Sequence, residues 1–158
     1  MSKITTCLWF NGRAEEAATF YVSLFPDAHV GAISRYGEGS PFPAGTAMMV
    51  EFTLAGQTYQ ALNGGPHFTF SEAISLSVSC ADQAEVDHYW DALIADGGAE
   101  SRCGWLKDRF GVSWQIVPQV LGELSQRGDR AATGRMFQAL MGMRRLDIAA
   151  LEAAYRGA

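Results

Sequence analysis

Two glutamines, Gln60 and Gln115, stand at the same place in two similar stretches of the chain. In each stretch a glycine is followed three residues later by an aromatic residue, Tyr59 or Trp114, and then by the glutamine. A side-chain amide donates and accepts hydrogen bonds, so it suits the recognition of a polar ligand. Because side chains alternate along a strand, each glutamine points away from its aromatic neighbour. The repeat therefore predicts two equivalent glutamines that face one cleft.

Other side chains that can bind a ligand occur on the strands expected around the glutamines. Strand alternation brings small polar and apolar residues to the same cleft. A tryptophan can stack on a planar ligand, or it can belong to the core. Asn63 begins a glycine-rich linker whose backbone can approach a ligand closely. We expect ligand contacts from Thr6, Leu8, Trp9, Gln60, Asn63, Ser75, Ser77, Trp105 and Gln115.

Three residues are candidates for catalysis, each with a structural alternative. Glu51 lies between apolar residues of an expected strand, where burial perturbs a carboxylate unless it faces water. His67 lies in the linker and titrates near neutral pH. Cys103 follows Arg102, and nearby cations lower the pKa of a thiol, but no histidine base stands at a recognisable spacing from it. An inert thiol is the alternative for Cys103.

The elements that position these residues follow one order twice. A strand at residues 4–10 and a helix at 13–25 precede further strands, and a strand at 73–80 and a helix at 83–96 do the same. Asp82, with Glu85 three residues later, predicts the start of the second helix. We therefore expect a single domain made of a first unit (3–63), a linker (64–72), a second unit (73–118) and a helical tail (119–158).

The tail changes to helical spacing after Pro118, with Asp129 and Asp147 as expected N-caps. Its methionines suit irregular surfaces as well as cores. Two interpretations stay open: the tail packs on its own domain, or it contacts a second subunit.

Charge and composition exclude several classes of partner. The chain has 158 residues, 12 Lys and Arg, and a net charge of -5, so the basic face that binds nucleic acid is not expected. No stretch reaches the roughly 18 apolar residues of a membrane span, and we expect a cytoplasmic protein. Three cysteines without a Cys-x-x-Cys spacing argue against a disulfide framework.

The chain resembles the PhnB-like family, often labelled demethylubiquinone methyltransferase, within the vicinal oxygen chelate superfamily. The resemblance rests on Trp9 to Ala17 with Phe20-Tyr21, Ala61 to Pro66, Ala73 to Leu76, Trp90, Leu93, Cys103 to Pro118, and Asp147-Ile148 with Leu151. It implies an α+β fold of two pseudo-symmetric βαβββ units (the glyoxalase/bleomycin-resistance fold), here followed by the C-terminal helical tail, and a homodimer. The methyltransferase label is an inherited name. A common S-adenosylmethionine site needs a glycine-rich turn after its first strand, where this chain has only Gly12.

The resemblance also implies four positions that bind a metal in other members of the superfamily. They correspond here to Thr6, Gln60, Ala73 (with Ser75 beside it in the strand) and Gln115. None is a strong ligand for a transition metal, and the three histidines have no ligand spacing. We expect neither a metal nor a cofactor.

These observations favour metal-free binding of a small hydrophobic or aromatic molecule. The alternative is a metal-independent isomerase, lyase or transferase that uses Glu51, His67 or Cys103. A true methyltransferase is the third interpretation.

Overall fold

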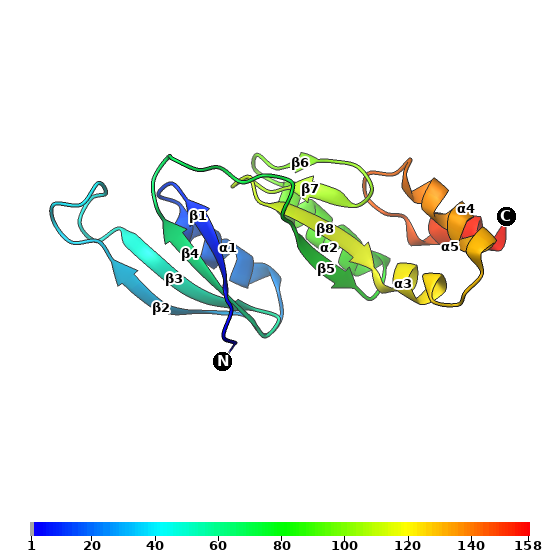
Figure 1. Ribbon diagram of the computed structural model, residues 1–158, viewed down its shortest axis with the longest axis horizontal. Coiled ribbons are helices and arrows are strands. Elements are labelled where there is room, and N and C mark those ends of the chain that lie inside the picture. The colour runs from blue at the N-terminus through cyan, green and yellow to red at the C-terminus, as the bar shows by residue number, and fades with distance from the viewer. Residues whose placement is uncertain (1) are drawn as a thin grey trace. The chain divides into compact units, whose positions relative to one another are not determined.

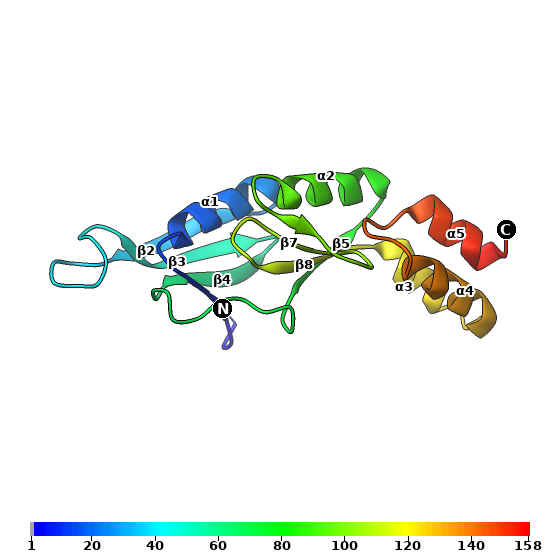
Figure 2. The ribbon, with the colours of Figure 1, turned by 90° about the horizontal axis from the view of Figure 1, so that it is seen from above.

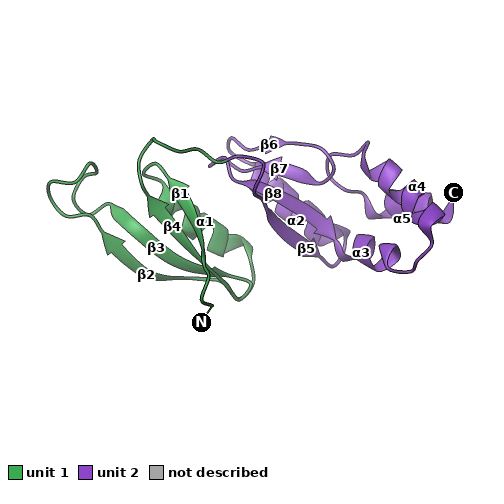
Figure 3. Ribbon diagram, in the orientation of Figure 1, with its two compact units in different colours: residues 1–70 green, residues 71–158 purple. Residues whose placement is uncertain are grey.

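The computed structural model describes residues 2–158 and divides the chain into two compact units, one ending at Phe70 and the other beginning at Ser71 (Figure 3). The first unit contains one helix and four strands. They are β1 (Thr6–Phe10), α1 (Ala14–Leu24), β2 (His29–Arg35), β3 (Ala47–Leu54) and β4 (Gln57–Asn63).

The strands of the first unit form one sheet in the order β1-β4-β3-β2 (Figure 1). β1 and β4 are parallel, and the remaining pairs are antiparallel. α1 covers one face of this sheet (Figure 2). The helix buries Ala17, Ala18 and Tyr21, and the ring of Tyr21 packs near that of Phe52 on β3. The apolar stripe of α1 therefore determines which sheet face is the core.

The second unit repeats this arrangement. Its sheet has the order β5-β8-β7-β6, again with a parallel first pair and antiparallel neighbours, and α2 covers one face (Figure 2). The α+β fold with a repeated βαβββ order and a helical tail is thus confirmed. The elements are β5 (Leu76–Cys80), α2 (Gln83–Ile94), β6 (Ala99–Glu100), β7 (Trp105–Lys107) and β8 (Ser113–Pro118).

The first strand of the second unit is shorter than expected. It begins at Leu76, whereas the sequence predicts a strand from Ala73. The Ser71 side chain accepts a hydrogen bond from the Ala73 backbone N–H at 3.0 Å, and the Ile74 N–H donates to the Ser71 carbonyl at 3.4 Å. A serine that binds the backbone two residues on favours a turn over an extended strand, so Ala73 lies in a turn.

Three helices form the tail: α3 (Gln119–Ser125), α4 (Arg130–Leu140) and α5 (Ile148–Arg156). The expected N-caps are confirmed, because Asp129 accepts from the Ala132 N–H and Asp147 from the Ala150 N–H. The helices share a core with partly buried residues of the second unit. Its fully buried members are Leu124, Met136, Leu140, Leu146 and Leu151.

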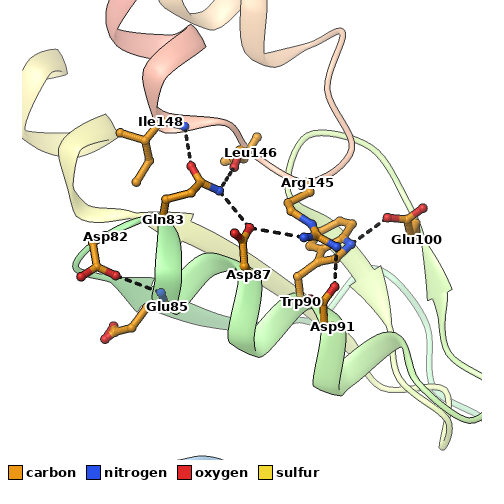
Figure 4. Close-up of polar contacts among 10 residues, drawn as sticks. All are labelled: Asp82, Gln83, Glu85, Asp87, Trp90, Asp91, Glu100, Arg145, Leu146 and Ile148. Carbon is orange, nitrogen blue, oxygen red and sulfur yellow. Dashed lines mark hydrogen bonds and ion pairs between the residues drawn. The ribbon is translucent and has the colours of Figure 1, made fainter.

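Polar contacts join the tail to α2 (Figure 4). Gln83 donates to the Leu146 carbonyl at 3.1 Å and accepts from the Ile148 N–H at 2.8 Å. Arg145 contacts Asp87 and Asp91, and its guanidinium lies 6.0 Å from the Trp90 ring centroid. The tail therefore packs on its own unit, as the first of the two interpretations expects.

Within residues 2–158, none of the helices has the length and apolar character that crossing a bilayer requires.

Candidate functional site

The two glutamines occupy equivalent positions in the two sheets. Gln60 on β4 lies opposite Cys7 on the parallel strand β1, and Gln115 on β8 lies opposite Ser77 on β5. The glycines that precede them, Gly56 and Gly111, both have positive φ angles (79° and 92°), which glycine adopts without steric cost. The repeated glycine, aromatic residue and glutamine thus mark one structural position that occurs twice.

Both glutamines point to the sheet face opposite the helix of their unit. In the first unit, Tyr59 stacks on Phe52 at 5.4 Å between ring centroids, on the side of α1, and Gln60 alternates to the other side. In the second, Trp114 is 1% exposed in the core, whereas Gln115 is half-buried. The alternation predicted from the sequence therefore holds for both residues.

Four of the expected ligand contacts gather on the face opposite α2. Gln115 donates a hydrogen bond to the Ser75 hydroxyl, with 2.9 Å between nitrogen and oxygen. Ser77 on β5 and Trp105 on β7 are the direct neighbours of Gln115 on its two sides. Ser77 is exposed, and the other three side chains are half-buried. An amide, two hydroxyls and an indole ring are thus available on one surface.

A depression of about 370 Å³ continues this surface toward the tail. It begins at Ser77 and Ser79 and ends at α3, where Gln119 and Glu123 line it. Its size falls within the range of small-molecule sites, about 300–1,000 Å³.

In the first unit the equivalent face carries Cys7, Trp9, Glu51 and Gln60. Cys7 and Glu51 flank Gln60 on the neighbouring strands, and both are exposed. Trp9 is already held by the linker, because its indole Nε1 donates to the Gly65 carbonyl at 2.9 Å. Trp9 is thus a packed side chain on the same face as Gln60.

The linker approaches Trp9 closely at Gly64. A Cβ atom at Gly64 would lie 2.4 Å from the indole ring, closer than any normal contact. Phe68 packs edge-on against the same ring at 4.9 Å between centroids. The glycine-rich linker therefore packs against Trp9. Its glycines allow the backbone to approach an indole ring of the chain itself, whereas the sequence suggested approach to a ligand.

Thr6 and Leu8 do not share the face of Gln60, contrary to expectation. The pairing of β1 with β4 places Thr6 opposite Tyr59 and Leu8 opposite Ala61, on the side of α1. Leu8 is 6% exposed and belongs to the core. The expectation placed the side chains of β1 on the wrong faces of the sheet, by one residue. The register between two parallel strands that are distant in sequence cannot be inferred from the sequence alone.

Asn63 holds the first unit together. It is 1% exposed, its amide oxygen accepts from the Ala14 N–H at 3.0 Å, and its nitrogen donates to the Ala47 carbonyl at 2.9 Å. The N–H of Ala14 is one of the backbone groups that a helix leaves unpaired at its start, so Asn63 caps α1 from the end of β4. This buried structural role corrects its expected role as a ligand contact.

The three catalytic candidates lie in different surroundings. Glu51 and His67 are exposed residues of the first unit. In the second unit, Cys103 packs against the tail core, and its thiol lies 3.9 Å from the Met141 carbonyl. The depression that ends at α3 is lined by other residues.

Asp108 has a buried structural role that was not predicted from the sequence. It is 2% exposed and accepts hydrogen bonds from the N–H groups of Phe110 and Val112, at 2.8 and 3.0 Å. Its second oxygen accepts from the Trp114 indole at 2.9 Å. The sequence did contain a signal for this role. Asp108 begins the turn that ends at Gly111, and an aspartate at the start of a turn accepts a hydrogen bond from the backbone N–H two residues later.

The donor set does not suit a transition metal. Strand pairing places Cys7, in place of the expected Thr6, beside Gln60 in the first unit, and Ser77, in place of the expected Ala73, beside Gln115 in the second unit. Each unit by itself thus offers one amide with one thiol or one hydroxyl. Partial withdrawal from water raises the pKa of the Cys7 thiol, although the residue keeps contact with solvent, and this disfavours the thiolate that a metal binds. Among residues 2–158, no three His, Cys, Asp or Glu side chains are grouped as metal ligands.

Several solved structures are similar to this chain. A protein from Bacillus cereus, described as a 3-demethylubiquinone-9 3-methyltransferase and PhnB protein, is 40% identical, with 74% of this chain and 99% of that chain covered and a TM-score of 0.69. Protein PA1353 from Pseudomonas aeruginosa is 24% identical, with 75% and 98% covered and a TM-score of 0.61, and shows the fold alone.

A more distant structure agrees on the fold. The fosfomycin resistance protein FosX from Listeria monocytogenes, complexed with Mn(II) and sulfate, is 12% identical, with 80% and 97% covered and a TM-score of 0.54. None of the curated proteins matches the chain. The family model described as 3-demethylubiquinone-9 3-methyltransferase matches residues 2–117, so the tail helices lie outside it. The chain therefore belongs to this family of 3-demethylubiquinone-9 3-methyltransferase-labelled, PhnB-like proteins.

Proposed function

We propose that the protein binds a small hydrophobic or aromatic molecule, without a metal, on the face of the second sheet opposite α2. The observation that supports this most is the Gln115 side chain, which Ser75 holds beside Ser77 and Trp105. One amide N–H of Gln115 is used by Ser75, which leaves the second N–H and the carbonyl oxygen for a ligand. Trp105 supplies a ring on which a planar molecule stacks.

The chemistry of the donors supports metal-free binding. Amides and hydroxyls recognise a ligand directly through hydrogen bonds, but they compete poorly with imidazole or carboxylate for a divalent transition metal. Ligand affinity then depends on shape, stacking and a few polar contacts.

A thermal-shift screen in the presence of EDTA tests the proposal. We expect aromatic compounds that raise the Tm of the wild-type protein by about 2 °C or more. Gln115→Leu, which keeps the side-chain volume but removes the amide, is expected to abolish this stabilisation. Gln138→Leu is the matched control, since Gln138 is exposed on α4, and it is expected to respond like the wild type. Stabilisation that requires an added divalent metal, or that survives Gln115→Leu, contradicts the proposal.

The alternative, a metal-independent isomerase, lyase or transferase, needs its acid, base or nucleophile beside the ligand. Of the three candidates, Cys103 belongs to the second unit, and its thiol is directed at the Met141 carbonyl of the tail. No observation on the described residues favours this alternative over binding. The label of the family is a name that the chain shares with its relatives.

Two further expectations stay predictions. The homodimer implied by the family is checked by sedimentation equilibrium, which is expected to give twice the mass of the 17.1 kDa chain. The cytoplasmic location is checked by fractionation of the source cells.

A further inference from the structure

A second depression lies beside the proposed site, on the same face of the second sheet. Its volume is about 340 Å³, and Trp105, Lys107 and Ser113 line it together with Glu72. Lys107 pairs with Ser113 across β7 and β8, and Trp105 pairs with Gln115 two residues along. These side chains therefore share the face opposite α2. The volume falls at the lower end of the range for small-molecule sites.

Ser113 has a buried hydroxyl without a partner. The residue is 2% exposed, and its Oγ makes no hydrogen bond to any group in residues 2–158. Native proteins pair nearly all buried polar side chains, and each exception needs an explanation. Folding removes water from the Ser113 hydroxyl without giving it a hydrogen-bond partner in the protein. A ligand that offers this hydroxyl a hydrogen-bond acceptor therefore gains affinity.

An exposed ion pair lies next to this hydroxyl. Lys107, the cross-strand neighbour of Ser113, contacts the Glu72 carboxylate, and the two side chains are 45% and 62% exposed. Pairs so open to water contribute little to stability, so Lys107 can move aside at small cost and open the way to Ser113. The depression is thus lined by an exposed ion pair that is free to rearrange and by the buried hydroxyl beside it.

The charges of the depression select for an uncharged ligand. Hydrogen bonding to Lys107 holds the pKa of Glu72 below its usual value, so this carboxylate is ionised at neutral pH and neutralises Lys107. Glu100 also lines the depression, but its carboxylate accepts a hydrogen bond from the Trp90 indole and lies 3.8 Å from Arg144. The lining therefore offers no cation that is not already neutralised, and an anion would lose its hydration there without gaining an ion pair.

We propose that this depression binds an uncharged, planar aromatic molecule with a carbonyl group. The ring stacks on Trp105, and the carbonyl oxygen accepts a hydrogen bond from the Ser113 hydroxyl. The inference rests on the proposed function in that Trp105 flanks both the depression and Gln115, and it adds the chemical class of the ligand.

Isothermal titration calorimetry with 2-naphthamide, in EDTA buffer, tests the proposal. The matched probe is 2-naphthoate, which has the same ring system but carries a negative charge. The wild-type protein is expected to bind the amide at least about tenfold more tightly than the carboxylate. Equal affinity, tighter binding of the carboxylate, or no binding of the amide overturns the proposal.

Ser113→Ala separates recognition from structural effects. Because it removes an unpaired buried hydroxyl, its Tm is expected to equal or exceed that of the wild type, while its affinity for 2-naphthamide falls about tenfold. Ser34→Ala, at an exposed serine of β2 in the first unit, is the control and is expected to change neither quantity. A marked fall in Tm for Ser113→Ala shows that the hydroxyl is paired in the native protein and overturns the proposal, as does unchanged affinity.

Failure here is distinguishable from failure of the proposed function. Ligands found by the thermal-shift screen that depend on Gln115 but not on Ser113 leave the proposed function intact and refute this inference. Binding of 2-naphthamide that depends on Ser113 but not on Gln115 supports this inference, even where Gln115 proves dispensable.

Discussion

At the residue scale, the carboxylate of Asp108 holds the turn that positions β8. Its three hydrogen bonds, to Phe110, Val112 and Trp114, come from one buried side chain. Gln115 directly follows Trp114, so this carboxylate also fixes the place where the candidate site begins.

Asp108→Asn is expected to destabilise the protein by about 2–3 kcal/mol, because hydrogen bonds to charged groups contribute about 1.5–3 kcal/mol. The asparagine oxygen can still accept from the two backbone N–H groups, but its NH2 group then faces the Trp114 N–H, donor against donor. Urea unfolding measures the change. Asp96→Asn, whose side chain is 79% exposed, is the control and is expected to change stability by less than about 0.5 kcal/mol. Equal effects of the two substitutions contradict the role of Asp108.

Several residues show where sequence reasoning about single positions succeeds and fails. The face of Gln115 could be predicted, because a glycine turn and an apolar neighbour determine the phase of β8. The face of Thr6 could not, because β1 pairs with a strand about fifty residues away and only that pairing sets its phase. The structural role of Asn63 could not be predicted for a similar reason, because both of its hydrogen-bond partners, Ala14 and Ala47, are remote in sequence.

At the element scale, α2 serves two surfaces of the second unit. Its buried stripe, which includes Val86, Trp90 and Leu93, covers the sheet. Its other side holds the tail through Gln83 and through the contacts of Arg145 with Asp87 and Asp91 (Figure 4). The apolar stripe of α2 and the capping box at Asp82 were visible in the sequence, whereas these polar contacts to the tail were not.

Gln83→Leu is expected to loosen the tail while leaving the sheet intact. The substitution leaves the Ile148 N–H and the Leu146 carbonyl without their side-chain partner. Hydrogen exchange in α4 and α5 is expected to become about tenfold faster, which corresponds to about 1.4 kcal/mol of local stability, with no change in β8. Gln138→Leu is the control on the exposed side of α4. Unchanged protection of α5 in Gln83→Leu contradicts the anchoring role.

At the scale of the whole molecule, the duplication was the most predictable feature. The two sheets have the same strand order and the same mixture of parallel and antiparallel pairs, as the repeated order of predicted elements indicated. Strand boundaries were less predictable: β5 begins three residues later than expected, because Ser71 forms a turn with Ala73. The tail helices were predicted from their caps, but their anchoring on α2 required the structure.

The shared family label leads to a direct expectation about S-adenosylmethionine. The turn between β1 and α1 contains one glycine, Gly12, and the Ala14 N–H at the start of the helix is occupied by Asn63. The glycine-rich, unpaired helix start that such a cofactor uses is therefore not formed there. We expect no saturable heat when S-adenosylmethionine is titrated into the protein. A saturable isotherm of one site per chain contradicts this view.

The central claim is that a small molecule binds at Gln115 and Trp105 without a metal. The most direct measurement is an NMR titration, in EDTA, of labelled protein with the best stabilising compound from the screen. We expect the Gln115 side-chain amide and the Trp105 indole N–H signals to shift in a saturable manner, with the Gln138 amide unchanged. Signals of Gln115 and Trp105 that stay in place while others shift, or that move only after a divalent metal is added, contradict the claim.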